Sequence, residues 1–125
     1  MVLADGVFDP IHFGHIQYLL IAAHVSQPLI VHIAPDEAIA SKGRLPFQSR
    51  SERAMTVLAL GCVDSVRMWP SLAEAIEQEK PRYLVKGAEW RDKLPNDVLA
   101  ACKRYDVEII YADVNAKRSS ERLAG

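Results

Sequence analysis

Two histidines near the start of the chain have a spacing that suits phosphate chemistry. His12 and His15 stand three residues apart, so in a helix they would share one face of the first turn. The free N–H groups and the dipole of a helix N-terminus already attract anions, and two imidazoles beside that end would strengthen the attraction. Gly6 allows a close approach of the backbone, and Gly14 keeps the helix start free of bulk. The pattern predicts a phosphate-binding turn.

The residues on both sides of this turn predict a strand that leads into a helix. Residues 1–4 form a short apolar run, which is consistent with a buried strand. Apolar side chains then recur at helical spacing, which predicts a helix from about Phe13 to Val25. In a parallel α/β sheet, ligands bind in the crevice at the carboxyl ends of the strands. The two histidines are therefore expected at the mouth of such a crevice.

The rest of the chain alternates predicted strands with predicted helices. Four further apolar runs, at residues 29–34, 62–68, 83–85 and 107–111, predict strands. Capping boxes at residues 49–52 and 71–74 predict the starts of two helices, and Pro-Asn-Asp at residues 95–97 predicts another. This alternation predicts an α/β fold with a Rossmann-like, doubly wound parallel sheet of five strands. We expect the strand order 3-2-1-4-5, with helices on both faces.

The composition is that of one ordinary globular domain, and we expect residues 1–125 to form it. Hydrophobic residues make up 50% of the chain and charged residues 25%. The formal net charge of −1, from 15 basic and 16 acidic residues, provides no overall field for nucleic acid or an anionic membrane. Cys62 and Cys102 lie far apart, which favours two reduced thiols. Because no signal peptide or membrane-length apolar run is recognised, a cytoplasmic location is expected.

The stretch around the two histidines carries a family resemblance. Residues 6–15 read G-V-F-D-P-I-H-F-G-H, which resembles the G-x-F-D-x-x-H-x-G-H signature of the cytidylyltransferase-like nucleotidyltransferases. That family includes glycerol phosphate cytidylyltransferase and the adenylyltransferase domain of bacterial heptose synthesis enzymes. The resemblance implies a nucleotidyltransferase in which His12 and His15 are catalytic. It assigns nucleotide binding to five further positions, with the aspartate orienting the turn rather than acting as a base: Gly6, Val7, Phe8, Asp9 and Gly14.

Two basic residues beyond the first predicted helix extend the expected site. Lys42 lies beside Gly43 in a loop after the second predicted strand, from which it would project into the same crevice. The family keeps a lysine in this loop, so the resemblance implies that Lys42 is catalytic and neutralises phosphate charge. Arg53 stands in the first turn of a predicted helix, where a cation opposes the dipole and indicates an anionic partner. The resemblance assigns it to the phosphate of the acceptor, and a structural pair with Glu52 or Asp64 is the alternative.

The sequence at the end of the fourth predicted strand also resembles the family. Residues 84–90 read L-V-K-G-A-E-W, which is similar to the "VKGGDW"-like text of related enzymes. The resemblance assigns Lys86 and Gly87 to the nucleotide. It assigns Glu89, which replaces the usual aspartate, and Trp90 to the substrate. Packing of Trp90 in the core is the alternative.

The C-terminal serines partly match a further family motif. Ser119 and Ser120 resemble the "I-S-T-[ST]-x-I" motif, whose hydroxyl residues cap a terminal helix that holds triphosphate oxygens. Arg118, next to Lys117, would supply charge to the substrate nearby. An ordinary capped C-terminus is the alternative reading of these residues.

The remaining two histidines match no compact metal-ligand spacing, so no metal residues are predicted. His32 is interpreted as a strand histidine at the edge of the site, and His24 as a residue at the end of the first helix. Mg²⁺ is the expected cofactor. We expect it to arrive with a nucleoside triphosphate, because it prefers phosphate oxygens and water to an all-protein cage.

These features predict a direct, in-line nucleotidyl transfer with pyrophosphate leaving, and the resemblance implies that AMP or CMP passes from ATP or CTP to a phosphorylated sugar or polyol. The G-x-S-x-G nucleophile, the G-x-G-x-x-G fingerprint and the P-loop text are absent from the sequence. The resemblance favours ATP with a sugar phosphate. A cytidylyltransferase acting on glycerol phosphate or another alcohol phosphate is the alternative, and a non-catalytic nucleotide-binding domain is a third reading. The expected partners are the triphosphate and a small phosphorylated acceptor, and relatives imply a homodimer.

Overall fold

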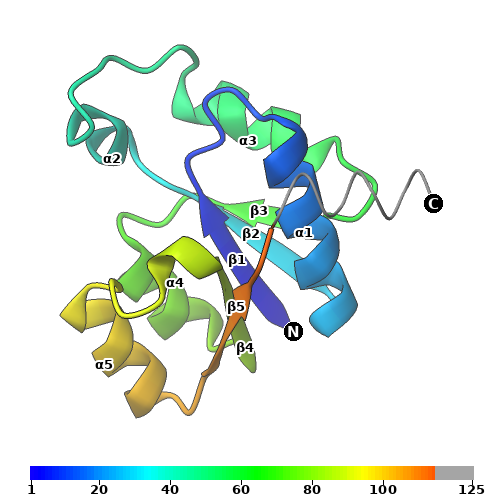
Figure 1. Cartoon of the computed structure of the whole chain (residues 1–125), viewed down its shortest axis with the longest axis vertical. Helices are drawn as coiled ribbons and strands as arrows, with labels where there is room; N and C mark the ends of the chain where they lie inside the picture. Colours follow the sequence, from blue (N-terminus) through cyan, green and yellow to red (C-terminus); the bar gives the residue numbers. More distant parts are fainter. Residues whose placement is uncertain (115–125) are drawn as a thin grey trace.

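A computed structural model describes residues 1–114 and contains one parallel sheet of five strands in the order β3-β2-β1-β4-β5 (Figure 1). All four neighbouring pairs are parallel. The predicted doubly wound sheet and its strand order are therefore confirmed. The strands are β1 (Val2–Gly6), β2 (Leu29–Ile33), β3 (Ser65–Arg67), β4 (Tyr83–Gly87) and β5 (Glu108–Ala112).

Helices cover both faces of the sheet, as predicted. They are α1 (Phe13–Val25), α2 (Asp36–Ala40), α3 (Arg50–Leu58), α4 (Leu72–Glu79) and α5 (Asn96–Arg104), with a short 3-10 turn η1 (Ala88–Trp90) after β4. One apolar core lies between the sheet and α1 with α3. The other lies between the sheet and α4 with α5. None of the helices in residues 1–114 is long and apolar enough to cross a membrane.

Strand β1 serves both cores because its side chains alternate between the two faces of the sheet. Val2 and Ala4 pack on the side of α1, whereas Leu3 packs on the side of α4 and α5. Neighbouring strands follow the same alternation, with Val31 on the first side and Ile30 on the second. The position of a polar residue along one of these strands therefore determines which face of the sheet its side chain lies on.

The helices begin where their sequence signals place them. The side chain of Ser49 accepts a hydrogen bond from the amide of Glu52, and the Glu52 carboxylate accepts one from the amide of Ser49. Ser71 caps α4 by accepting from the amide of Glu74. The loosely patterned residues 35–48, for which no long helix is predicted, contain only the five-residue helix α2.

Candidate active site

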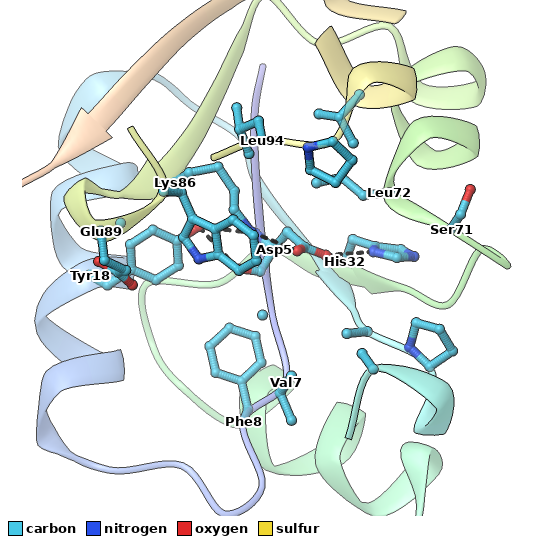
Figure 2. A pocket seen from close by; sticks show the side chains of 18 of the residues that line it. Asp5, Val7, Phe8, Tyr18, His32, Ser71, Leu72, Lys86, Glu89 and Leu94 are labelled. Atoms are coloured by element: carbon cyan, nitrogen blue, oxygen red, sulfur yellow. Dashed lines mark hydrogen bonds and ion pairs between the residues drawn. The ribbon is translucent and has the colours of Figure 1, made fainter. Parts of the chain in front are cut away.

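A cavity of about 760 Å³ opens at the carboxyl ends of the strands. It lies between the turn after β1, the segment after β2 that contains α2, the beginnings of α4 and α5, and the turn after β4 (Figure 2). Most of the described residues that the sequence predicts for the site line it together: Gly6, Val7, Phe8, His12, Gly14, His15, Lys42, Lys86, Gly87, Glu89 and Trp90. Arg118, Ser119 and Ser120 lie outside the described residues.

The two histidines cap α1 with their own rings. His12 Nδ1 accepts a hydrogen bond from the amide of Gly14 at 3.1 Å, and His15 Nδ1 accepts one from the amide of His12 at 3.1 Å. The rings stack with their centroids 3.6 Å apart. An Nδ1 atom that accepts from an N–H carries no proton, so each neutral ring carries its proton on Nε2. The cap therefore fixes both imidazoles as Nε2–H donors at the helix N-terminus.

His15 is held in its neutral form at physiological pH. Burial, followed by electrostatic repulsion from His12 and Lys42, lowers the pKa of His15 from 6.5 to about 4. The edge of the Phe8 ring meets the His15 ring at 5.1 Å between centroids and contributes to this burial. His15 can therefore donate its Nε2 proton in a hydrogen bond without first losing a proton from Nδ1.

The backbone of the turn is strained at Phe8. This residue has φ +52°, in the left-handed region that non-glycine residues rarely occupy, and its side chain is buried. The Phe8 ring lies against Gly6, where an added Cβ would come within 2.6 Å of the ring. The prediction for Gly6 is a close approach of the backbone, and in the structure its missing side chain leaves room for the Phe8 ring.

Asp9 fastens the turn to the loop that follows α2. Its carboxylate accepts hydrogen bonds from Arg44 Nη1 at 2.8 Å, from the amide of Phe47 at 2.9 Å and from the amide of Gln48 at 2.8 Å. Burial alone would raise the pKa of Asp9, but these donors outweigh it and hold the pKa below its usual range. The carboxylate is committed to the loop, so it orients the turn and is not placed to contact a nucleotide.

Arg53 is fully buried and braces the same region from α3. Its guanidinium donates to the carbonyls of Val7 at 2.9 Å and Ala34 at 2.8 Å, and to Asp36 Oδ1 at 2.7 Å. The expected anionic partner is therefore Asp36, which the sequence pattern did not single out. Arg53 has no exposed surface and does not line the cavity in this arrangement, so its assignment to the acceptor's phosphate stays a prediction.

Charged groups from three neighbouring strands form the floor of the cavity (Figure 2). Asp5 Oδ1 lies 2.8 Å from His32 Nδ1, and Asp5 Oδ2 lies 3.0 Å from Lys86 Nζ. Lys86 Nζ also lies 4.4 Å from the centre of the Trp90 ring. His32 was expected at the edge of the site, whereas Asp5 was missed. The available signal was a carboxylate directly after an apolar run that predicts a strand; that it lies in register with His32 is shown only by the structure.

The turn after β4 forms one wall of the cavity. Trp90 is 38% exposed and lines the cavity, so the alternative of core packing is not what the structure shows. The Glu89 carboxylate folds back over Gly87, where an added Cβ would come within 2.3 Å of it. Tyr18 ties this wall to the centre of the sheet, since its hydroxyl donates to the carbonyl of Val85 and accepts from the amide of Asp5.

Residues at the opposite end of the cavity were not predicted from the sequence. They come from the beginnings of α4 and α5 and include Ser71, Leu72, Pro95 and Asp97. Figure 2 shows Ser71 and Leu72 across the cavity from Tyr18 and Glu89.

Within residues 1–114, no group of three or more His, Cys, Asp or Glu side chains is arranged to hold a metal ion. His24 is exposed near the end of α1 and lines a separate, smaller cavity with Cys62 and Asp64. Cys62 and Cys102 are both free thiols.

Similar proteins share this fold and sequence pattern. A sequence model described as cytidylyltransferase-like matches residues 3–122. A D-beta-D-heptose 1-phosphate adenylyltransferase of Bordetella bronchiseptica is 32% identical over 131 residues, covering 100% of this chain and 80% of that protein. The bifunctional protein HldE of Campylobacter jejuni is 39% identical over 98 residues, covering 75% of this chain and only 21% of HldE. The crystal structure of a lipopolysaccharide core biosynthesis protein from Thermoplasma volcanium covers 91% of this chain and 96% of its own, with a TM-score of 0.78 at 24% identity, which shows the fold alone.

Proposed function

The chain belongs to the cytidylyltransferase-like nucleotidyltransferase family, and we propose that it transfers AMP from ATP to a phosphorylated sugar. The observation that carries the proposal is that two histidines, whose Nδ1 atoms are held in the α1 cap and whose Nε2 atoms are left as donors, line a cavity together with Lys42. The name of the Bordetella relative, which refers to adenylyl transfer and to heptose 1-phosphate, supports the choice of nucleotide and acceptor.

The reaction is a direct displacement at the α-phosphorus of the triphosphate. A phosphate oxygen of the acceptor forms the new bond to this phosphorus, while the bond to the bridging oxygen of the β-phosphate breaks and pyrophosphate leaves. An acceptor phosphate is already a competent nucleophile, so the site needs no strong base. The protein contributes position and charge compensation rather than covalent chemistry.

Each group at the turn has a defined part in that displacement. His12 and His15 donate from Nε2 to the non-bridging oxygens of the α-phosphate, where negative charge accumulates in the transition state. Their stacked rings and capping hydrogen bonds hold these donors before substrate arrives. Lys42, which lines the cavity on the segment after α2, compensates the charge of the phosphates. Because Asp9 and Arg53 fix the backbone of this region, they act on the reaction through position alone.

Magnesium is expected to enter the cavity as part of the substrate. Carboxylates grouped as a metal cage are not found among the described residues, and Mg²⁺ prefers phosphate oxygens and water. We propose that it arrives bound to the triphosphate.

A substrate panel tests the proposal. Pyrophosphate release is measured with ATP and with CTP, each combined with heptose 1-phosphate, other sugar 1-phosphates and glycerol 3-phosphate, in the presence of Mg²⁺. We expect release with ATP and a sugar phosphate, and loss of that release in His15→Asn. Release with CTP and glycerol phosphate would instead identify a cytidylyltransferase. Binding of nucleotide without release in every combination would contradict catalysis and favour a nucleotide-binding domain.

A further inference from the structure

Three charged side chains meet under the cavity because the strand register places them side by side. Asp5 on β1 is paired with His32 on β2. Lys86 on β4 follows Val85, which is paired with Ala4, so Lys86 lies level with Asp5 on its other side. All three project towards the face that α4 and α5 cover, because each follows by two residues a side chain packed there. Figure 2 shows Asp5 between the other two.

The cluster is built into the protein rather than spread over its surface. The side chains of His32, Lys86 and Asp5 are 1%, 6% and 11% exposed, and all three residues line the cavity. Asp5 uses a different carboxylate oxygen for each cation, at 2.8 Å and 3.0 Å. Buried charges of this kind are stable only when each one is paired.

Two acceptors face the ring of His32, an arrangement that suits a ring carrying two protons. Nδ1 faces the carboxylate of Asp5 at 2.8 Å, and Nε2 faces the main-chain carbonyl of Trp69 at 2.9 Å. Both groups are acceptors, and only the imidazolium form donates from both nitrogens. Burial would raise the pKa of Asp5, but Lys86 and His32 outweigh it and lower the pKa, so the carboxylate is ionised. Arg50 also donates to the Trp69 carbonyl, and its Nη2 lies 3.4 Å from His32 Nε2, where a neutral ring would accept from it, so the protonation of His32 is a point for experiment.

With His32 in its imidazolium form, the charges of the cluster do not cancel. One carboxylate faces two cations, His32 and Lys86, which leaves a single positive charge at the floor. If His32 were neutral, Asp5 would compensate Lys86 completely. A triphosphate in the cavity would then meet a floor without net charge.

We propose that Asp5 and His32 are positioning residues, which hold Lys86 in a fixed place beneath Trp90 and keep its positive charge available to the phosphates of the substrate. This inference rests on the proposed function, since it concerns the same cavity. The Asp5 carboxylate holds the ammonium group of Lys86, and the positive charge of His32 compensates the negative charge of Asp5. Neither residue needs to touch the substrate itself.

The first test reads the protonation of His32 without any substitution. In the ¹⁵N-labelled full chain at pH 7.5, long-range ¹H–¹⁵N spectra distinguish a doubly protonated imidazole from either neutral tautomer. We expect two protonated nitrogens in His32. In the same spectrum, we expect His15 to carry its proton on Nε2 alone, which provides an internal control. An unprotonated nitrogen in His32 would overturn the proposal.

The second test uses substitutions whose charge effects have opposite signs. Binding of Mg–ATP and Mg–CTP is measured by calorimetry for the full chain and its variants, after circular dichroism has shown that each is folded. His32→Gln leaves a neutral floor, and we expect affinity to fall about tenfold, equivalent to about 1.4 kcal/mol. Asp5→Asn combined with His32→Gln removes one charge of each sign. We expect this double variant to bind within about threefold of the unmodified chain.

The double variant separates a charge effect from simple damage to the core. If His32 and Asp5 were merely structural, two buried substitutions would weaken nucleotide binding more than one, and that outcome would overturn the proposal. Turnover gives a second readout, because Lys86 loses its anchor in the double variant. We therefore expect kcat to stay lowered while the affinity returns. If His32→Gln does not fold, the proposal is tested by the nucleotide affinity and kcat of the double variant relative to the unmodified chain, together with the ¹⁵N spectra.

Failure of the proposed function would look different. A chain that binds neither nucleotide but shows an imidazolium at His32 would refute the assigned reaction and the role of the cluster in it, and would leave the floor geometry intact. A chain that releases pyrophosphate but shows a neutral His32 would refute only the positioning role.

Discussion

Replacing His15 by asparagine or by glutamine distinguishes the roles of its two ring nitrogens. An asparagine side chain can place its Oδ1 near the position of Nδ1, so it can still accept from the amide of His12. It offers no donor at the position of Nε2. Glutamine reaches the position of Nε2 with an N–H group but loses the short acceptor of the cap. We expect His15→Asn to abolish most turnover while the fold is kept, and His15→Gln to retain more turnover in a less stable protein.

The expected magnitudes follow from the contacts of the ring. Removing one preorganised donor to a developing oxyanion costs about 10²–10³-fold in kcat, or about 2.7–4 kcal/mol of transition-state stabilisation. A lost helix cap costs about 1 kcal/mol of folding stability. We therefore expect the asparagine variant to lose about 10²–10³-fold in kcat, with KM for the triphosphate changed less than about threefold. The glutamine variant should lose about 1 kcal/mol in the free energy of unfolding.

Steady-state pyrophosphate release gives kcat and KM, and urea unfolding followed by circular dichroism gives the free energy of unfolding. The reasoning would be refuted if His15→Asn turned over like the unmodified chain, because the Nε2 donor would then be dispensable. It would also be refuted if KM alone rose, since a donor that acts in the transition state must change kcat.

Three further outcomes follow from the structure. Folding lowers the pKa of His15 from 6.5 to about 4, so between these pH values the folded chain binds fewer protons than the unfolded chain. The free energy of unfolding in urea should therefore be highest above pH 6.5 and fall as the pH is lowered towards 4. The fall should be shallower in His15→Asn, which lacks the titrating ring. Arg53→Met leaves one buried and one partly buried carbonyl without their donor and should lower the free energy of unfolding in urea by roughly 2–5 kcal/mol, whereas Lys103→Met at an exposed position should lower it by under about 0.5 kcal/mol. Gly6→Ala brings a Cβ within 2.6 Å of a buried phenylalanine ring and should lower the free energy of unfolding in urea by about 1–3 kcal/mol. Gly61→Ala, whose Cβ meets nothing within 4 Å, should leave that free energy nearly unchanged, and equal effects of the two substitutions would contradict the packing described.

Two ion pairs near the turn connect it to neighbouring segments. Asp9 and Arg44 join the turn to the segment before α3, and Arg53 with Asp36 joins it to the end of β2. These pairs hold the backbone around Phe8 in its strained conformation. A rigid turn of this kind keeps the imidazole donors in place for a reaction that depends on position.

Local patterns in the sequence were sufficient to predict the elements and their order. The apolar runs, the capping boxes at Ser49 and Ser71 and the spacing of His12 and His15 each depend on residues within a few positions of one another. Alternation of strands and helices then leaves few parallel topologies, and the observed order is one of them. The clustering of most predicted site residues in one cavity follows from the same topology, because all strand ends meet at one edge.

The tertiary structure alone decided which partner each buried charge has. Asp5 and Lys86 are 81 residues apart in the chain, and Arg53 reaches a carbonyl 46 residues away. Their partners depend on the register of the strands and on the packing of α3 against the turn, and neither is written in the spacing of neighbouring residues. A buried charge pairs with the group that the fold brings within hydrogen-bond distance. The free-energy cost of leaving that charge unpaired is larger than the free energy that local sequence preferences contribute. For that reason the sequence determined where the phosphate turn lies, and the fold determined what holds it in place.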